Sequence, residues 1–139
     1  AACMISDREL IDLAIEARKA AYTPYSNFKV GAALLSGNGE VYKGCNIENA
    51  AYTPTNCAER TAFFKAVSEG VTDFETIAIV GGYDKEELKF CPPCGVCRQV
   101  MMEFCKSDKF RVLLLDEKGE IKSYLLKELL PFGFGPKNL

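Results

Sequence analysis

Three cysteines stand at spacings that suit a metal ion. Cys94 and Cys97 are three residues apart, so on a helix their side chains share one face. Cys57 belongs to a separate segment and can approach the pair only through the fold. Three thiolates can hold Zn²⁺ at about 2.3 Å each and leave the fourth tetrahedral position open for water. Such an open position is typical of a catalytic zinc site and not of a structural one.

Glu59 is the candidate proton carrier of this site. It follows Cys57 by two residues, so its carboxylate can reach a water at the open position without being a ligand. The chain contains no histidine, which leaves a carboxylate, lysine, tyrosine or cysteine for proton transfer. Arg60 and the helix N-termini are expected to draw negative charge from the sulfurs, because three thiolates outweigh the charge of one zinc ion.

Two other interpretations of the cysteines remain open. Cys91 forms a second Cys-x-x-Cys motif with Cys94, and as a fourth ligand it would close the site and make it structural. Two prolines stiffen that segment, so we expect the Cys91 sulfur to point elsewhere. A thioredoxin-like redox pair of Cys94 and Cys97 needs no metal, but it leaves Cys57 and Glu59 without a role.

Composition narrows the classes of function. The 139 residues suit one domain, 1–139, with residues 1–5 expected to be disordered or foreign to it. The net charge is −2 and no basic cluster occurs, which argues against nucleic acid as a partner. No segment reads as a membrane span or export signal, so we expect a cytoplasmic protein. The seven cysteines then indicate thiolate chemistry or burial, with Cys45 and Cys105 assigned to the core.

The elements that must position the cysteines follow from periodicity and turn residues. Ser6 and Glu9 form a capping box before a helix that is expected to end near Tyr22, ahead of Thr23-Pro24. Gly37-Asn38-Gly39 predicts a hairpin. Each cysteine segment starts a helix that follows the sheet. The expected elements are helices to about residue 22 and over 57–69, 94–105 and 127–130, and strands over 30–35, 41–45, 76–80, 110–115 and 121–125. The loop 82–93 precedes the third helix. This order predicts an α/β fold, a three-layer α/β/α arrangement with a five-stranded mixed sheet.

The paired motifs resemble a known family. Cys57-Ala58-Glu59-Arg60 and the segment Pro93–Gln99 are similar to the cytidine deaminase family in its small three-cysteine form, and the resemblance extends from about Leu10 onward. It implies one Zn²⁺ per subunit and hydrolysis of cytidine and deoxycytidine to uridine and deoxyuridine plus ammonia, in pyrimidine salvage. It also implies that Glu59 carries a proton from water to ring nitrogen 3.

The resemblance further implies substrate contacts and partners. Asn46 and Glu48 match residues that grip the ribose, Phe28 matches an aromatic residue that packs on the base, and Ala58 is a further expected substrate-binding residue. The family is usually homotetrameric with shared sites, and Ala50, Tyr52 and Phe134 match the shared positions, with Phe132 as the rival of Phe134. Free bases, nucleotides, nucleic acid and aminonucleoside antibiotics are the competing substrates. Pro92 departs from the usual Ser or Thr, but it keeps the backbone carbonyl that the family uses to hold the amino group.

Overall fold

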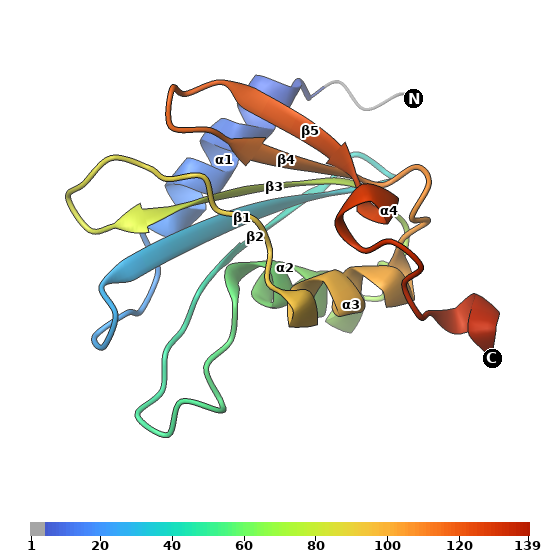
Figure 1. Ribbon diagram of the computed structural model, residues 1–139, viewed down its shortest axis with the longest axis horizontal. Coiled ribbons are helices and arrows are strands. Elements are labelled where there is room, and N and C mark those ends of the chain that lie inside the picture. Colours follow the sequence, from blue (N-terminus) through green and yellow to red (C-terminus); the bar gives the residue numbers. More distant parts are fainter. Residues whose placement is uncertain (1–4) are drawn as a thin grey trace.

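A computed structural model describes residues 5–139, and the expectation for residues 1–4 lies outside them. The chain forms four α-helices, five strands and a final 3₁₀ turn within the described residues, and the sheet runs through its middle (Figure 1). The elements are α1 (Asp7–Arg18), β1 (Phe28–Ser36), β2 (Val41–Cys45), α2 (Ala58–Ser68), β3 (Phe74–Tyr83), α3 (Gly95–Phe104), β4 (Arg111–Leu115), β5 (Ile121–Leu125), α4 (Leu126–Leu129) and η1 (Pro136–Asn138).

The sheet is mixed, as the sequence predicts. Its strand order is β2-β1-β3-β4-β5. β1 is antiparallel to both β2 and β3, β3 is parallel to β4, and β4 is antiparallel to β5. Because β2 and β3 both oppose β1, they run in the same direction and their carboxyl ends lie at one edge. The chain leaves that edge twice, and each time it goes on to a helix whose first residues carry cysteines.

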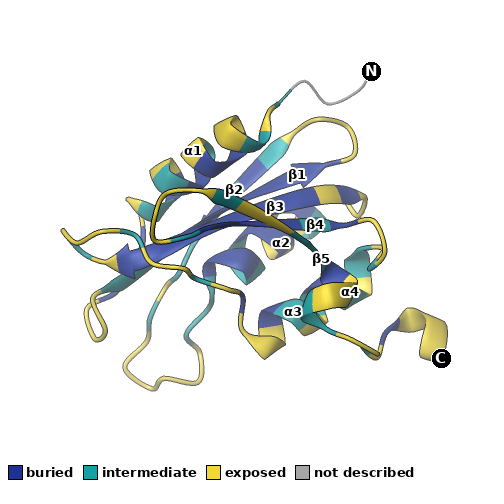
Figure 2. Cartoon of the chain, turned by 45° about the horizontal axis from the view of Figure 1, so that its top comes forward, coloured by how far each residue is buried: buried dark blue, intermediate teal, exposed yellow. Residues whose placement is uncertain are grey.

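Helices cover both faces of the sheet, which confirms the three-layer prediction. α1 packs on one face, whereas α2 and α3 pack on the other (Figure 1). The central strands are therefore buried along most of their length (Figure 2). The core is divided by the sheet into two clusters, one beneath α2 and α3 around Phe63 and Phe110, the other beneath α1 around Leu10 and Ile11.

Two glycines let helices approach the sheet closely. A Cβ on Gly44 of β2 would lie 2.4 Å from the carbonyl oxygen of Ala58 and 2.6 Å from the amide of Ala62. A Cβ on Gly31 of β1 would lie 2.0 Å from the Ala14 carbonyl oxygen. A residue with any side chain would clash with the helix backbone at these two positions, so only glycine fits there. Gly44 thus sets the distance between the sheet and the first turn of α2, the turn that follows Cys57.

Three predicted boundaries are wrong by a few residues. α1 ends at Arg18 and not near Tyr22, because the Tyr22 amide donates to the Asn46 carbonyl and draws the chain into a bridge with Ile47. β3 continues to Tyr83, so the loop 82–93 is shorter than predicted. The extra residues are paired with the start of β1, which itself begins at Phe28. Lys29 and the glycines at 81 and 82 interrupt the apolar runs, so apolar periodicity starts β1 at Val30 and ends β3 at Val80.

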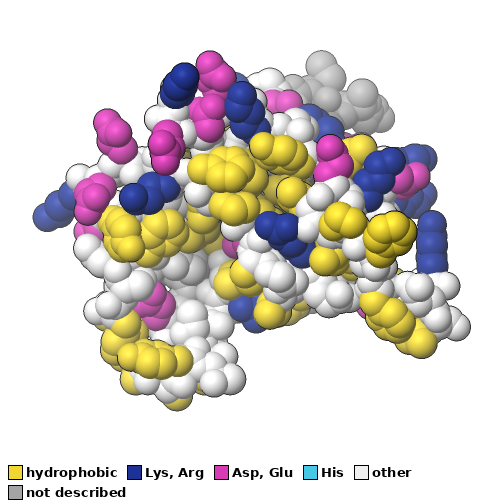
Figure 3. Space-filling model, viewed as in Figure 1, with side chains coloured by type: hydrophobic (Ala, Val, Ile, Leu, Met, Phe, Trp, Pro, Cys, Tyr) yellow, Lys and Arg dark blue, Asp and Glu magenta, His cyan; other side chains and the backbone are white. Residues whose placement is uncertain are grey.

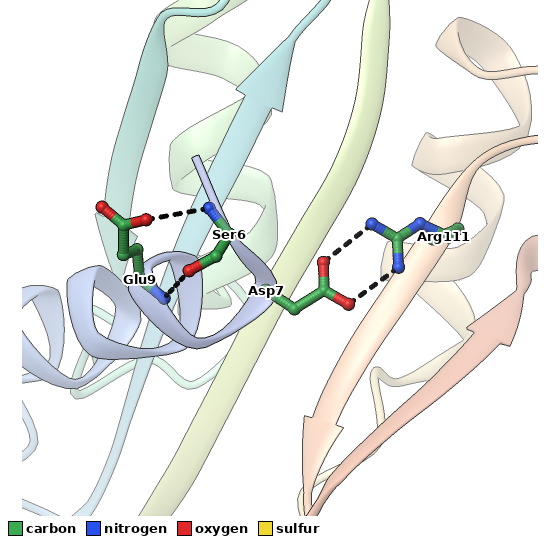
Figure 4. Close-up of polar contacts among 4 residues, drawn as sticks. All are labelled: Ser6, Asp7, Glu9 and Arg111. Atoms are coloured by element: carbon green, nitrogen blue, oxygen red, sulfur yellow. Dashed lines mark hydrogen bonds and ion pairs between the residues drawn. The ribbon is translucent and has the colours of Figure 1, made fainter. Parts of the chain in front are cut away.

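The start of α1 is fastened in two ways (Figure 4). Ser6 and Glu9 form the predicted capping box, with both bonds at 3.1 Å. Asp7 accepts two hydrogen bonds from the Arg111 guanidinium, at 2.8 and 3.0 Å, and so joins α1 to β4. Ile5 packs partly buried against the cluster beneath α1.

The surface carries charges of both signs. Lysine and arginine are interspersed with acidic side chains over the face shown in Figure 3, and hydrophobic side chains form several groups across it, one of them at the loop of residues 46–56. Within residues 5–139, no helix combines the length and the apolar character that a membrane span requires.

Candidate active site

The three predicted ligand cysteines lie together. Cys57 is the N-cap of α2, Cys94 is the N-cap of α3, and Cys97 lies in the first turn of α3. The Sγ atoms are 3.8 Å apart for Cys57 and Cys94 and 3.5 Å apart for Cys94 and Cys97, and all three lie within 4.8 Å of one another. These distances and this donor set fit a tetrahedral Zn²⁺ that takes one thiolate from each residue.

Helix termini and hydrogen bonds favour the ionised form of one thiol. The Cys57 pKa falls to about 5, first through a hydrogen bond from Cys97 and then through Arg60. The Cys97 pKa is raised correspondingly, because its proton stabilises the neighbouring thiolate. The Cys97 amide also donates to the Cys94 sulfur at 3.5 Å. The N-terminus of α3 therefore directs an N–H group at a sulfur, as helix N-termini do for anions, whereas the Cys57 sulfur at the start of α2 receives its bond from Arg60.

Glu59 is buried although it carries a carboxyl group. Only 4% of the residue is exposed, and it lies in the first turn of α2. Burial raises its pKa to about 7, and the negative charge of Cys57 adds to the effect. A carboxyl group with such a pKa can both accept and release a proton near neutral pH.

Arg60 contacts the sulfur cluster directly. One of its Nη atoms donates to the Cys57 sulfur at 3.3 Å, and its buried Nε has no partner among residues 5–139. A charge-assisted bond of this kind removes negative charge from the thiolate. The contact agrees with the charge-tuning role that we expect for Arg60.

The fourth nearby cysteine lies outside the cluster. Among the described residues, the sulfurs within 4.8 Å of one another belong to Cys57, Cys94 and Cys97, and not to Cys91. The Cys91 sulfur packs instead over Gly81, where a Cβ would approach it to 2.7 Å. Burial raises the Cys91 pKa to about 12. Of the two cysteines assigned to the core, Cys105 packs against it and Cys45 is half-buried at the end of β2.

The two residues expected at the ribose are bonded to the segment that carries Phe28. Asn46 accepts from the Val30 amide and donates to the Phe28 carbonyl, both at 2.8 Å. Glu48 accepts from the Tyr25 amide at 2.9 Å, the Ser26 amide at 3.1 Å and the Ser26 hydroxyl. These bonds lower the Glu48 pKa against the opposing effect of desolvation, so its carboxylate is ionised.

The other predicted contacts differ in exposure. Phe28 is half-buried against Tyr83, with ring centroids 5.1 Å apart, and Ala58 is fully buried. Tyr52 is 73% exposed, and Ala50 is also exposed. In the tail, Phe132 projects into solvent, while Phe134 is 57% exposed and its carbonyl accepts from Gln99 at 2.8 Å. The structure therefore places Phe134, and not Phe132, next to α3.

A pocket of about 440 Å³ lies beside the candidate ribose residues. Its lining comprises Tyr25, Ser26, Glu48, Asn49, Tyr52 and Thr55. Of the two candidate ribose residues, Glu48 lines this pocket, whereas Asn46 and the cysteines are not among the lining residues. The sequence did not predict that Ser26 and Thr55 line this pocket, because a hydroxyl in a loop gives no periodic signal. For Ser26, the turn Thr23-Pro24-Tyr25-Ser26 was the available clue.

An open sheet with a cysteine cluster at two helix N-termini and a buried carboxyl beside it defines a zinc-dependent hydrolytic enzyme. The family model described as "Cytidine and deoxycytidylate deaminase zinc-binding region" matches residues 4–113. The chain belongs to this family.

Similar proteins support the same assignment. A cytidine deaminase of Sporosarcina psychrophila is 50% identical over 131 residues, covering 94% of this chain and 93% of its own length. One from Halalkalibacterium halodurans is 51% identical over 134 residues, with coverage of 96% and 98%. The crystal structure of a Burkholderia pseudomallei cytidine deaminase superposes with a TM-score of 0.84 at 45% identity, covering 94% of this chain and all of that one.

Proposed function

We propose that this protein deaminates cytidine and deoxycytidine by hydrolysis, giving uridine or deoxyuridine and ammonia. The observation that carries the proposal is the three-sulfur cluster next to a buried carboxyl group of pKa about 7. The two relatives are named cytidine deaminases, and the alignment covers nearly their whole length, which supports the same reaction here.

Each residue of the cluster has a distinct task in this reaction. Cys57, Cys94 and Cys97 hold the zinc. Bound zinc supplies a Lewis acid that lowers the pKa of a water molecule. Glu59 accepts the proton of that water and delivers it to ring nitrogen 3, so that the oxygen adds to carbon 4. Glu59 then takes the remaining proton from that oxygen and delivers it to the amino group, which leaves as ammonia when its bond to carbon 4 breaks. Arg60 withdraws negative charge from the Cys57 thiolate, so that the water remains acidic enough to give its proton to Glu59.

The remaining contacts orient the nucleoside. Phe28 packs on the base, and Ala58 is a further substrate contact. Arg98 donates to the Pro93 carbonyl at 2.7 Å, and the Pro92 carbonyl receives no hydrogen bond from residues 5–139. The Pro92 carbonyl therefore remains available to the amino group of the base.

The sugar contacts favour a nucleoside over a free base. Asn46 and Glu48 hold the ribose hydroxyls. Because the Glu48 carboxylate is ionised, it would repel the negative charge of a nearby 5′-phosphate. A free base would leave both residues without a ligand partner.

The oligomer and the cellular setting complete the proposal. We assign a homotetramer in which Ala50, Tyr52 and Phe134 of one subunit contact the site of a neighbour; the exposure of all three in a single chain supports this. The six cysteines of residues 5–139 are free, which suits a reducing compartment and supports the cytoplasm and pyrimidine salvage.

A side-by-side ultraviolet assay tests the substrate. Cytidine, deoxycytidine, deoxycytidine monophosphate and cytosine are each incubated with the zinc-loaded protein. Turnover of the two nucleosides, with little or none of the monophosphate and the free base, is the expected result. Turnover of the monophosphate alone would show that the substrate assignment is wrong.

A further inference from the structure

The hydroxyl of Thr61 lies where three segments meet. Thr61 is in the second turn of α2, and its Oγ1 is 3.0 Å from the Cys45 carbonyl oxygen and 3.2 Å from the Cys57 carbonyl oxygen. The Asn56 side-chain amide donates to the same oxygen at 3.1 Å. A hydroxyl can donate one hydrogen bond and accept others, so Thr61 connects the end of β2, the last residue before Cys57 and the helix itself.

These contacts close the base of the loop of residues 46–56. The loop starts immediately after Cys45 and ends at Asn56. Just inside, Ile47 and Asn56 exchange two backbone hydrogen bonds of 2.9 Å, which form an isolated antiparallel bridge. Ile47 lies between Asn46 and Glu48, the two candidate sugar contacts. A displacement of this bridge would therefore move both sugar contacts together.

The same threonine belongs to the helix that carries the reacting groups. Its amide donates to the Cys57 carbonyl at 3.0 Å, and it follows Glu59 by two residues. At Gly44 the backbone of β2 also packs closely against the first turn of α2, so the helix and the sheet are in direct contact beside the loop base. The base of the loop, which we call the joint, therefore determines the position of the two sugar contacts relative to the three cysteines.

We propose that Thr61, with Asn56, is a positioning residue that fixes the sugar-binding loop relative to the zinc helix and so contributes to nucleoside recognition. This inference rests on the proposed function for its effect on substrate. Neither residue touches the reacting atoms; they act through the Ile47–Asn56 bridge on Asn46 and Glu48.

Hydrogen exchange tests the joint itself, independently of activity. Thr61→Val keeps the shape of the side chain and removes the hydroxyl, while Thr61→Ser keeps the hydroxyl. We expect the Ile47 and Asn56 amides to exchange about two- to tenfold faster in Thr61→Val, the effect of one lost hydrogen bond. The Thr61→Ser variant should match the parent. Unchanged exchange at both amides in Thr61→Val would overturn the proposal, whatever the enzyme does.

Steady-state kinetics tests the consequence for substrate. With cytidine, Thr61→Val should raise KM about two- to tenfold and keep kcat within about twofold of the parent, with zinc content unchanged. The ratio of kcat/KM for cytidine to that for 2′,3′-dideoxycytidine should fall, because the loop can no longer hold the hydroxyls in place. Asn56→Ala should shift the same values in the same direction, and it serves if Thr61→Val fails to fold.

The matched control removes another hydroxyl of the same helix. Ser68 donates to the Lys65 carbonyl at 2.7 Å, far along α2 from the loop, so Ser68→Ala should change neither KM nor the substrate ratio. An equal loss of kcat/KM for both nucleosides in Thr61→Val would show a merely structural role and overturn the proposal. If the parent protein were inactive on every nucleoside, the proposed function would be contradicted. The hydrogen-exchange result would still decide whether Thr61 holds the base of the loop in place.

Discussion

Cys57 and Glu59 are separated by one residue, yet their acidities are in the reverse of the usual order. A free thiol is a weaker acid than a carboxyl group, but here the thiol has a pKa of about 5 and the carboxyl a pKa of about 7. Hydrogen bonds to the sulfur cause the first shift and burial of the carboxyl causes the second. The neighbouring environments thus suit one group to be a thiolate ligand and the other to carry a proton.

Glu59→Gln should abolish most turnover while the zinc stays bound. Glutamine fills the same volume but cannot accept a proton, so the loss should be about 10²–10⁴-fold in kcat. Steady-state assays with zinc analysis of the same samples measure both quantities. Glu69→Gln, at the exposed C-terminus of α2, is the control and should behave as the parent. Activity within tenfold of the parent in Glu59→Gln would exclude it as the proton carrier.

Arg60→Gln should lower activity more than it lowers metal content. The lost bond to the Cys57 sulfur is charge-assisted, which corresponds to a decrease of about ten- to a hundredfold in kcat/KM. Zinc content per chain should stay near that of the parent, because the three sulfurs remain. A parallel loss of zinc and activity would mean that Arg60 supports the metal site and does not tune it.

Cys91→Ser distinguishes the enzyme from a closed structural zinc site. The Cys91 sulfur lies outside the three-sulfur group, so the variant should retain one zinc per chain and most of its activity. Metal analysis after dialysis is the measurement, with Cys57→Ser as the positive control for loss. Release of zinc from Cys91→Ser would favour the four-thiolate interpretation.

At the scale of the elements, the sequence predicted what periodicity and turn residues encode. The hairpin at Gly37–Gly39, the helix starts at Cys57 and Cys94 and the mixed sheet are all confirmed. The end of α1 was wrong because a bridge between distant segments, Tyr22 and Ile47, competes with the helix. No local pattern records such a pairing.

The candidate site shows the same division. Cys94 and Cys97 are near in sequence, and their spacing on a helix predicts their convergence. Cys57 joins them because β2 and β3 run in the same direction and each is followed by a helix, an arrangement that the spacing of residues along the chain does not record. The hydroxyls of Ser26 and Thr61 escaped prediction, since a single polar residue in a loop or helix has many uses.

The Asp7–Arg111 pair makes the attachment of α1 to β4 dependent on pH. The hydrogen bonds from Arg111 lower the Asp7 pKa below its ordinary 3.8. Its contribution is therefore fully present above that value and is lost as the pH falls through the lowered folded pKa. Since both side chains are substantially exposed, the contribution is about 0.2–1 kcal/mol.

Asp7→Asn should therefore lower the melting temperature by a few degrees near neutral pH, and the difference from the parent should vanish in strong acid. Thermal unfolding across a pH series measures it. Asp12→Asn, which breaks an exposed pair with Arg8 on the same helix, is the control and should have a smaller effect. A difference that stays constant down to the lowest pH would contradict the ion-pair interpretation.

At the scale of the whole molecule, a single chain leaves two aromatic side chains near the candidate site exposed to solvent. Tyr52 and Phe134 are 73% and 57% exposed, and within residues 5–139 neither makes a ring contact or a hydrogen bond with the three cysteines. Large exposed aromatic side chains commonly mark surfaces that are buried in an assembly. The proposed tetramer would give these side chains a place at neighbouring sites.

Subunit mixing tests this sharing directly. Tyr52→Ala and Glu59→Gln should each be nearly inactive as pure oligomers, the first for want of a neighbour's aromatic ring and the second for want of its proton carrier. After dissociation and reassembly together, a site with Glu59 from one subunit and Tyr52 from the other is complete, so activity should rise well above the sum of the two. Light scattering should give four chains per particle for each sample. Activity that remains additive in reassembled tetramers would show that every site is built from one chain, because mixed particles then contain no site with both residues.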